Sequence, residues 1–181
     1  LPALVYLPSE NTSAVTYYPN GTGTDDGAVQ LQLDIGPVAE ADILSVVNAV
    51  YETELCTPDN AGPVKLWENA NKGFPVEEAE RTVQQFLRIG LAGRFSWCSI
   101  RAEQPGKLGR TDIEVVDDRI GAPGAITHHA LLELKVLRSF THTGSPYPDS
   151  NAKDAVSKGV NQAHAYGLTH NSLLRMLCCF D

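Results

Sequence analysis

The 181-residue sequence is 43% hydrophobic and 20% charged, and its formal net charge is −8. This composition is typical of one globular domain with or without a smaller appended unit, and no run approaches the roughly 18 consecutive apolar residues of a membrane-spanning helix. The four cysteines form no CxxC pair, which disfavours a zinc ribbon or a disulfide-rich secreted fold. The sequence starts at Leu1 without a signal-peptide pattern and ends directly after a strand-like run, so we expect a piece of a longer protein.

Charge is distributed unevenly along the chain. Residues 1–80 contain two basic and 13 acidic side chains, whereas residues 81–181 contain 12 basic and nine acidic ones. The second half is therefore the better candidate for contact with a polyanion, although such a difference between halves also arises without any function.

The first 74 residues are expected to form a β/α extension. Short β-prone runs occur at 4–7 and 14–18, and "AVQLQLDIG" at 28–36 alternates between apolar and polar residues, which predicts a half-buried strand. The stretch at 39–55 then has apolar residues at helical spacing. We expect this extension to be separate from the rest of the chain.

Residues 75–181 predict a helix, three strands, a helix and a final strand. The first helix is expected to start near Pro75 and to bury a stripe that includes Val83 and Leu87. The remaining predicted elements are strands at 94–103, 110–117 and 129–137, a helix at 152–167 and a strand at 173–180. The fold class is thus α/β, with a mixed central sheet flanked by helices.

Two of these strands carry charges among apolar residues. "GRTDIEV" contains Asp112 and Glu114, and "LLELKVL" contains Glu133 and Lys135. If the strands are neighbours, Asp112 and Glu133 converge, and two close carboxylates repel unless a cation lies between them. Mg²⁺ takes oxygen ligands and suits such a pair. Lys135 would then assist an attacking water or stabilise charge on a phosphate; a solvated Glu-Lys pair on an edge strand is the simpler alternative.

These segments, "GRTDIEV", "ELK" and a later "QAHAY", resemble the motifs of the PD-(D/E)XK nuclease superfamily. The resemblance covers about residues 75–181 and implies a restriction-endonuclease-like α-β-β-β-α-β core. It implies Asp112 and Glu133 as ligands of Mg²⁺ or Mn²⁺ and Lys135 as a catalytic residue. The residue before Asp112 is Thr111 rather than proline, a position that varies in the superfamily.

The resemblance extends to further residues. Gln162 and Tyr166 match a glutamine and a tyrosine four residues apart on a late helix, which implies that Gln162 is catalytic and that Tyr166 contacts phosphate or DNA. An additional site glutamate would be Glu103, or Glu80 or one of its neighbours. Arg110 and Lys107 precede the motif strand and are candidates for phosphate contact or for solvated turn charges. The five histidines form no evident cluster in the sequence, so we expect them in loops or on the surface.

The expected function is a metal-dependent nuclease that hydrolyses DNA, most readily as an endonuclease. The resemblance further implies a toxin or effector domain of a larger bacterial protein, delivered or secreted and then active in the cytoplasm, with an inhibitory immunity protein as partner. The alternatives are a catalytically inactive nuclease-like module that binds protein or nucleic acid, and an RNase on the same core.

Overall fold

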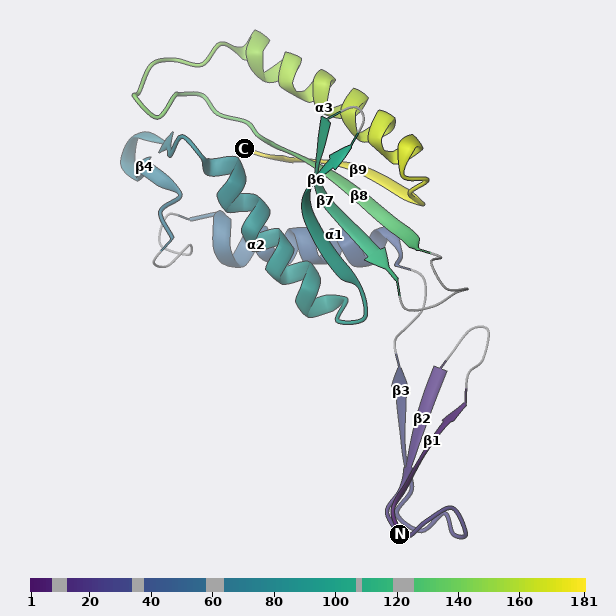
Figure 1. Cartoon of the computed structure of the whole chain (residues 1–181). Coiled ribbons are helices and arrows are strands. Elements are labelled where there is room, and N and C mark those ends of the chain that lie inside the picture. The colour runs from purple at the N-terminus through teal and green to yellow at the C-terminus, as the bar shows by residue number, and fades with distance from the viewer. Residues whose placement is uncertain (8–12, 34–37, 58–63, 107–108, 119–125) are drawn as a thin grey trace. The chain divides into compact units, whose positions relative to one another are not determined.

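The computed structural model describes residues 1–7, 13–33, 38–57, 64–106, 109–118 and 126–181. The chain divides into two compact units, Leu1–Pro37 and Val38–Asp181 (Figure 1). This division differs from the boundary at residue 74 that the sequence suggested.

The first unit is a three-stranded antiparallel sheet. Its strands are β1 (Ala3–Leu7), β2 (Ser13–Tyr18) and β3 (Val29–Leu33), in the order β1-β2-β3. The strands occur where the sequence predicts them, but the side chain of Val29 is 51% exposed and does not belong to a half-buried face. Among its described residues the unit has no helix that could cover an apolar face of the sheet.

The second unit begins with helix α1 (Glu40–Val50), which continues as a π-helical turn at Tyr51–Leu55. Ile43, Val46 and Val50 are buried in the same hydrophobic core as the central sheet. The predicted helix is therefore confirmed, but it belongs with the C-terminal elements rather than with a separate extension, because its apolar stripe is buried in their core.

Helix α2 (Ala79–Arg94) begins four residues later than predicted. Pro75 lies instead in the short strand β5 (Phe74–Pro75), which pairs with β4 (Trp67–Asn69), and a three-residue 3₁₀ turn at Ala70–Lys72 joins the two. Pairing with Trp67 holds Pro75 in an extended conformation, so the proline does not start the helix. The buried residues of α2 are Ala79, Val83, Leu87 and Leu91.

The central sheet has four strands in the order β6-β7-β8-β9. Neighbouring strands are antiparallel except β8 and β9, which are parallel and are joined through helix α3 (Asp149–Thr169). The strands are β6 (Ser99–Gly106), β7 (Gly109–Asp117), β8 (Thr127–Val136) and β9 (Leu174–Phe180). From α2 onward the element order is helix, three strands, helix, strand, as the sequence predicts.

Helices cover both faces of this sheet. Helices α1 and α2 lie on one face and α3 lies on the other (Figure 1). The core with α1 and α2 contains Ile113, Leu132 and Leu134, whose side chains alternate along the strands with those that face α3. Strand β8 is therefore buried on both sides, which explains why it is apolar on both faces. Among the described helices, none is both long enough and apolar enough to cross a membrane.

Candidate active site at the end of the β7–β8 ladder

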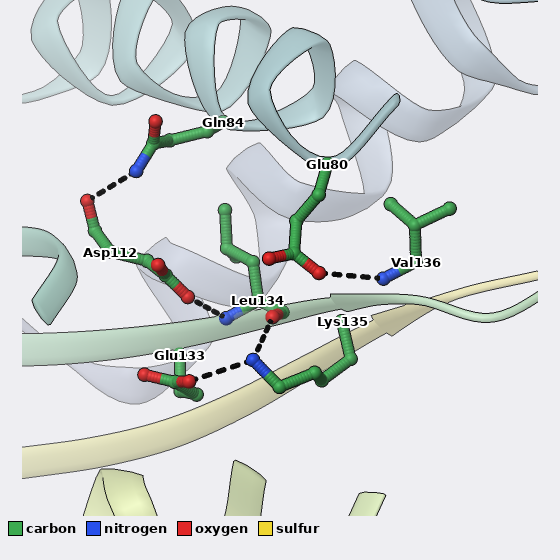
Figure 2. A network of polar contacts seen from close by, with 7 residues as sticks. All are labelled: Glu80, Gln84, Asp112, Glu133, Leu134, Lys135 and Val136. Atoms are coloured by element: carbon green, nitrogen blue, oxygen red, sulfur yellow. Dashed lines mark hydrogen bonds and ion pairs between the residues drawn. The ribbon is translucent and has the colours of Figure 1, made fainter. Parts of the chain in front are cut away.

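The hydrogen-bond ladder between β7 and β8 ends at the pair Ile113–Leu132. The next pair in this register would be Asp112 and Glu133. Beyond this pair a side chain takes the place of the backbone acceptor: Oδ2 of Asp112 accepts a hydrogen bond of 2.7 Å from the backbone N–H of Leu134. The backbone carbonyl of Asp112 accepts a bond of 2.8 Å from Nε2 of Gln84 on α2 (Figure 2). Side chains therefore satisfy two backbone polar groups beyond the end of the ladder, the N–H of Leu134 and the carbonyl of Asp112.

A second carboxylate lies along the same edge of β8. Oε2 of Glu80, in the first turn of α2, accepts a hydrogen bond of 3.4 Å from the backbone N–H of Val136 (Figure 2). Glu80 and Asp112 therefore bind backbone N–H groups two residues apart on one strand. Together with Arg81, Gln84, Glu103 and Leu134 they line a cavity of about 100 Å³.

Glu133 and Lys135 form an ion pair on the α3 side of β8. Nζ of Lys135 is 2.8 Å from Oε1 of Glu133 and donates a second bond of 2.8 Å to the carbonyl of Leu134 (Figure 2). The side chains of Glu133 and Lys135 are 2% and 17% exposed. Oε2 of Glu133 is buried and has no hydrogen-bond partner among the described residues. A solvated edge pair, the simpler alternative, does not fit this burial.

Both carboxyl groups of the site have raised pKa values. Burial raises the pKa of Asp112, and the charge of Glu103 adds to the rise. The hydrogen bond from the N–H of Leu134 and the charge of Lys135 lower this pKa, but the net shift is upward. Burial is also the largest cause of the raised pKa of Glu133; the hydrogen bond and charge of Lys135 oppose it, and the charges of Asp112 and Glu80 add to the rise. Two carboxyl groups with raised pKa values would each be stabilised in the charged form by a positive ion.

The charge of Lys135 is retained in this environment. Burial acts to lower the pKa of Lys135, but the hydrogen bond and charge of Glu133, together with the charges of Glu80 and Asp112, raise it overall. Lys135 is therefore an ammonium group at neutral pH, with two of its three N–H donors engaged by Glu133 and Leu134.

Glu103 lies close to the site in an unusual backbone conformation. The β6–β7 register places it between the pairs Ala102–Ile113 and Gln104–Thr111, and hence opposite Asp112. Its φ of 49° is in the left-handed region, which non-glycine residues seldom adopt. Its carboxylate is 3.0 Å from Nη1 of Arg110. Arg110, which the sequence suggested as a phosphate contact, therefore forms an exposed ion pair with Glu103. Lys107 lies outside the described residues.

The two predicted residues on α3 differ in their surroundings. Gln162 lines a cavity of about 280 Å³ together with Lys135, Tyr147, Asn151, Asp154, Ala155 and Lys158. Tyr166, in contrast, is 4% exposed, and its hydroxyl lies against Gly109, where a β-carbon would overlap it. Tyr166 therefore packs α3 against the start of β7, and a role in holding these elements together fits it better than the contact with DNA that the sequence suggested.

Sequence reasoning overlooked a second polar cluster. Glu114, which had no assigned role, is 2% exposed, and its carboxylate lies near His128 and His170, which were expected in loops or on the surface. His128 instead belongs to β8, and His170 caps the C-terminal end of α3. Neither spacing nor composition indicates this cluster, because its residues come from three elements far apart in the sequence.

Among the described residues, only this second cluster brings three potential metal-ligand atoms from histidine, cysteine or acidic side chains within 4.8 Å of one another. A metal ion at the first site would thus have only two protein ligands among the described residues, Asp112 and Glu133, and water would complete its coordination. Comparisons with protein-family models, curated proteins and solved structures give no match.

Proposed function

We propose that the chain is a metal-dependent nuclease that hydrolyses phosphodiester bonds of DNA. The observation that supports this most directly is that Asp112 and Glu133 both lie just beyond the last pair of the β7–β8 ladder, close enough for the charge of Asp112 to raise the pKa of Glu133, with Lys135 beside Glu133. Two acids with raised pKa values and a charged lysine are the groups that such a reaction needs at one place.

The topology supports the same proposal. The order α2-β6-β7-β8-α3-β9 and the mixed sheet β6-β7-β8-β9 agree with the α-β-β-β-α-β core that the sequence resemblance implies. We therefore propose a restriction-endonuclease-like core, in which the motif residues lie on the second and third strands of the sheet.

Asp112 and Glu133 would hold Mg²⁺ or Mn²⁺. The residues fit such an ion, because Oε2 of Glu133 is buried without a partner and both carboxyl groups are oxygen donors in need of positive charge. Mg²⁺ commonly binds through one or two carboxylates and keeps several waters, so two protein ligands are sufficient. When bound, the ion supplies Lewis acidity toward a phosphoryl oxygen.

Lys135 would stabilise negative charge that develops on the phosphate. Its raised pKa keeps it protonated, so it acts as a hydrogen-bond donor and a positive charge rather than as a base. Glu133 and the carbonyl of Leu134 fix the position of its ammonium group, which reduces the reorganisation needed during reaction. Gln162 lines the same cavity as Lys135 and would bind substrate there.

A groove beside the site supports a nucleic acid as substrate. It has a volume of about 630 Å³ and runs along α2 and β6. Arg81, Gln84 and Glu103 line both this groove and the smaller cavity at Asp112, and Arg88 lines the groove further along α2. The guanidinium groups would contact the phosphate backbone, which positions a strand without reading its sequence.

The test is incubation of the chain with circular and linear DNA, with RNA in parallel, in Mg²⁺ and in EDTA. We expect nicking of circular DNA only with the metal. Lys135→Ala should slow cleavage by about 100-fold or more, the usual effect of removing one group that stabilises transition-state charge. Lys153→Ala, which removes an exposed lysine of α3 outside the site, is the matched control.

Cleavage that persists in EDTA, or undiminished cleavage by Lys135→Ala, would refute this mechanism. Cleavage of RNA but not of DNA would show that the substrate is RNA and would leave the proposed metal-dependent mechanism unchanged. Binding of DNA without cleavage in Mg²⁺ would favour the inactive, nuclease-like binding module.

A further inference from the structure

Glu114, His128 and His170 come together on the α3 side of the sheet, from β7, β8 and the end of α3. Nδ1 of His170 is 2.9 Å from Oε1 of Glu114, and Nδ1 of His128 is 3.8 Å from Oε2. The two imidazole rings are 5.5 Å apart between centroids and nearly perpendicular, at 80°. One potential ligand atom of each residue lies within 4.8 Å of the other two.

The hydrogen bonds of the cluster are incomplete. Oε1 of Glu114 accepts a bond of 3.2 Å from the hydroxyl of Thr111 and faces Nδ1 of His170. Oε2 faces Nδ1 of His128 at 3.8 Å, which is too long for a hydrogen bond. Nδ1 of His128 is buried and has no partner among the described residues. Nδ1 of His128 is thus a buried polar atom of the cluster that needs a partner. A cation bound there would also offset the cost of burying the Glu114 carboxylate, which is 2% exposed.

Arg101, the basic residue paired with Glu114 across the strands, does not form an ion pair with the Glu114 carboxylate. Arg101 of β6 is opposite Glu114. Its guanidinium group forms an ion pair with Asp118 at 3.3 Å, while the carboxylate of Glu114 accepts a hydrogen bond from Thr111 and pairs with His170.

The spacing of the three residues suits one small metal ion. Ligands that bind Zn²⁺ at about 2.0–2.1 Å in tetrahedral geometry lie about 3.3 Å from one another. Nδ1 of His170 is 2.9 Å from one carboxylate oxygen of Glu114 and Nδ1 of His128 is 3.8 Å from the other, so the two separations lie on either side of this value. Two imidazole nitrogens and one carboxylate are a donor set that favours Zn²⁺ and similar transition metals, whereas Mg²⁺ prefers oxygen ligands.

We propose that Glu114, His128 and His170 bind one divalent transition-metal ion, best fitted by Zn²⁺, through the carboxylate of Glu114 and the two Nδ1 atoms. The fourth position is left for a water molecule. The ion links β7, β8 and the end of α3, so it stabilises the packing of that helix on the sheet. This site is separate from the pair Asp112–Glu133, and it does not depend on the proposed nuclease activity.

The first test is calorimetric titration of the metal-stripped full chain with Zn²⁺ and with Mg²⁺. We expect one Zn²⁺ per chain and no displacement of it by millimolar Mg²⁺. Combined His128→Ala and His170→Ala should weaken Zn²⁺ binding by about 100-fold or more, as should Glu114→Gln. Combined His142→Ala and His164→Ala, which alters two exposed histidines, is the matched control.

Asp112→Asn separates this proposal from the proposed function, because it should remove Mg²⁺-dependent cleavage and leave Zn²⁺ binding unchanged. The proposal is overturned by failure of the native chain to bind Zn²⁺, or by unchanged binding in the double variant His128→Ala with His170→Ala.

A second measurement on the unaltered chain guards against a variant that fails to fold. In ¹⁵N-resolved NMR spectra of the imidazole rings, Zn²⁺ should shift the Nδ1 resonances of His128 and His170 and leave the other three histidines unaffected. Shifts at any other pair of histidines, or at none, would contradict the assignment.

Discussion

At the scale of single residues, Asp112 has two roles that a substitution can separate. Its carboxylate accepts a hydrogen bond from the backbone N–H of Leu134, just beyond the end of the β7–β8 ladder. In the proposed mechanism the same carboxylate would also bind the metal. Asparagine keeps an oxygen for Leu134 and loses the charge. Alanine would lose both, so only asparagine tests the charge alone.

Asp112→Asn should stabilise the metal-free chain at neutral pH. The pKa of Asp112 is raised from 3.8, so the folded chain holds this proton more tightly than the unfolded chain does. Stability is therefore greatest below the unfolded pKa and falls as the pH rises through the folded pKa, because at higher pH the buried carboxylate is charged. The neutral amide avoids this loss.

Thermal unfolding from pH 3 to pH 7 measures this effect. The midpoint of the native chain should fall relative to that of Asp112→Asn as the pH rises above about 4. Added Mg²⁺ should then raise the midpoint of the native chain and not that of the variant. The control is Asp25→Asn, an exposed position of the first unit, and a midpoint for Asp112→Asn below that of the native chain at pH 7 would contradict the argument.

At the scale of elements, the contact of α3 with the sheet depends on a glycine. A β-carbon at Gly159 would lie 2.7 Å from Cδ1 of Leu177 and 3.3 Å from Cγ of Lys135. Because Gly159 has no side chain, the helix can approach β8 and β9 closely, at the position where it contacts the aliphatic part of Lys135. This packing contributes to holding the lysine stem in place.

Gly159→Ala should destabilise the chain by about 1–3 kcal/mol, the usual cost of overpacking, despite the better helix propensity of alanine. Gly93→Ala in α2 is the matched control, because nothing lies within 4 Å of the added β-carbon. It should raise stability by up to about 1 kcal/mol. Urea denaturation of both variants measures the free energies of unfolding, and equal effects of the two substitutions would rule out the close approach.

At the scale of the whole molecule, the core and not the sequence pattern sets the boundary of the folding unit. Ile43 and Val50 of α1, with Leu55 and Leu66, belong to the same buried cluster as Leu132 and Leu134 of the central sheet. A chain cut at residue 75 would lose these side chains and leave part of the apolar face of α2 exposed. A chain cut at residue 38 would keep the whole core.

Residues 38–181 should therefore fold alone and unfold cooperatively, with cleavage of DNA like that of the full chain. Residues 75–181 should lack a cooperative transition, because each buried aliphatic side chain contributes about 1.5–3 kcal/mol and total stability is only about 5–15 kcal/mol. Circular dichroism during heating distinguishes the two. A cooperative transition in the shorter chain would restore the boundary that the sequence suggested.

The sequence alone determined the order of the elements from α2 onward and the charged residues of the proposed active site. Alternation and helical spacing are local properties, and three charges within apolar strands are visible without a structure, as for Asp112, Glu133 and Lys135. Only the tertiary structure decided that Asp112 closes the end of the ladder, that α1 belongs to the main core, and that Glu114 meets His128 and His170. Those contacts join residues distant along the chain, so they depend on strand register and helix packing, which no local pattern contains.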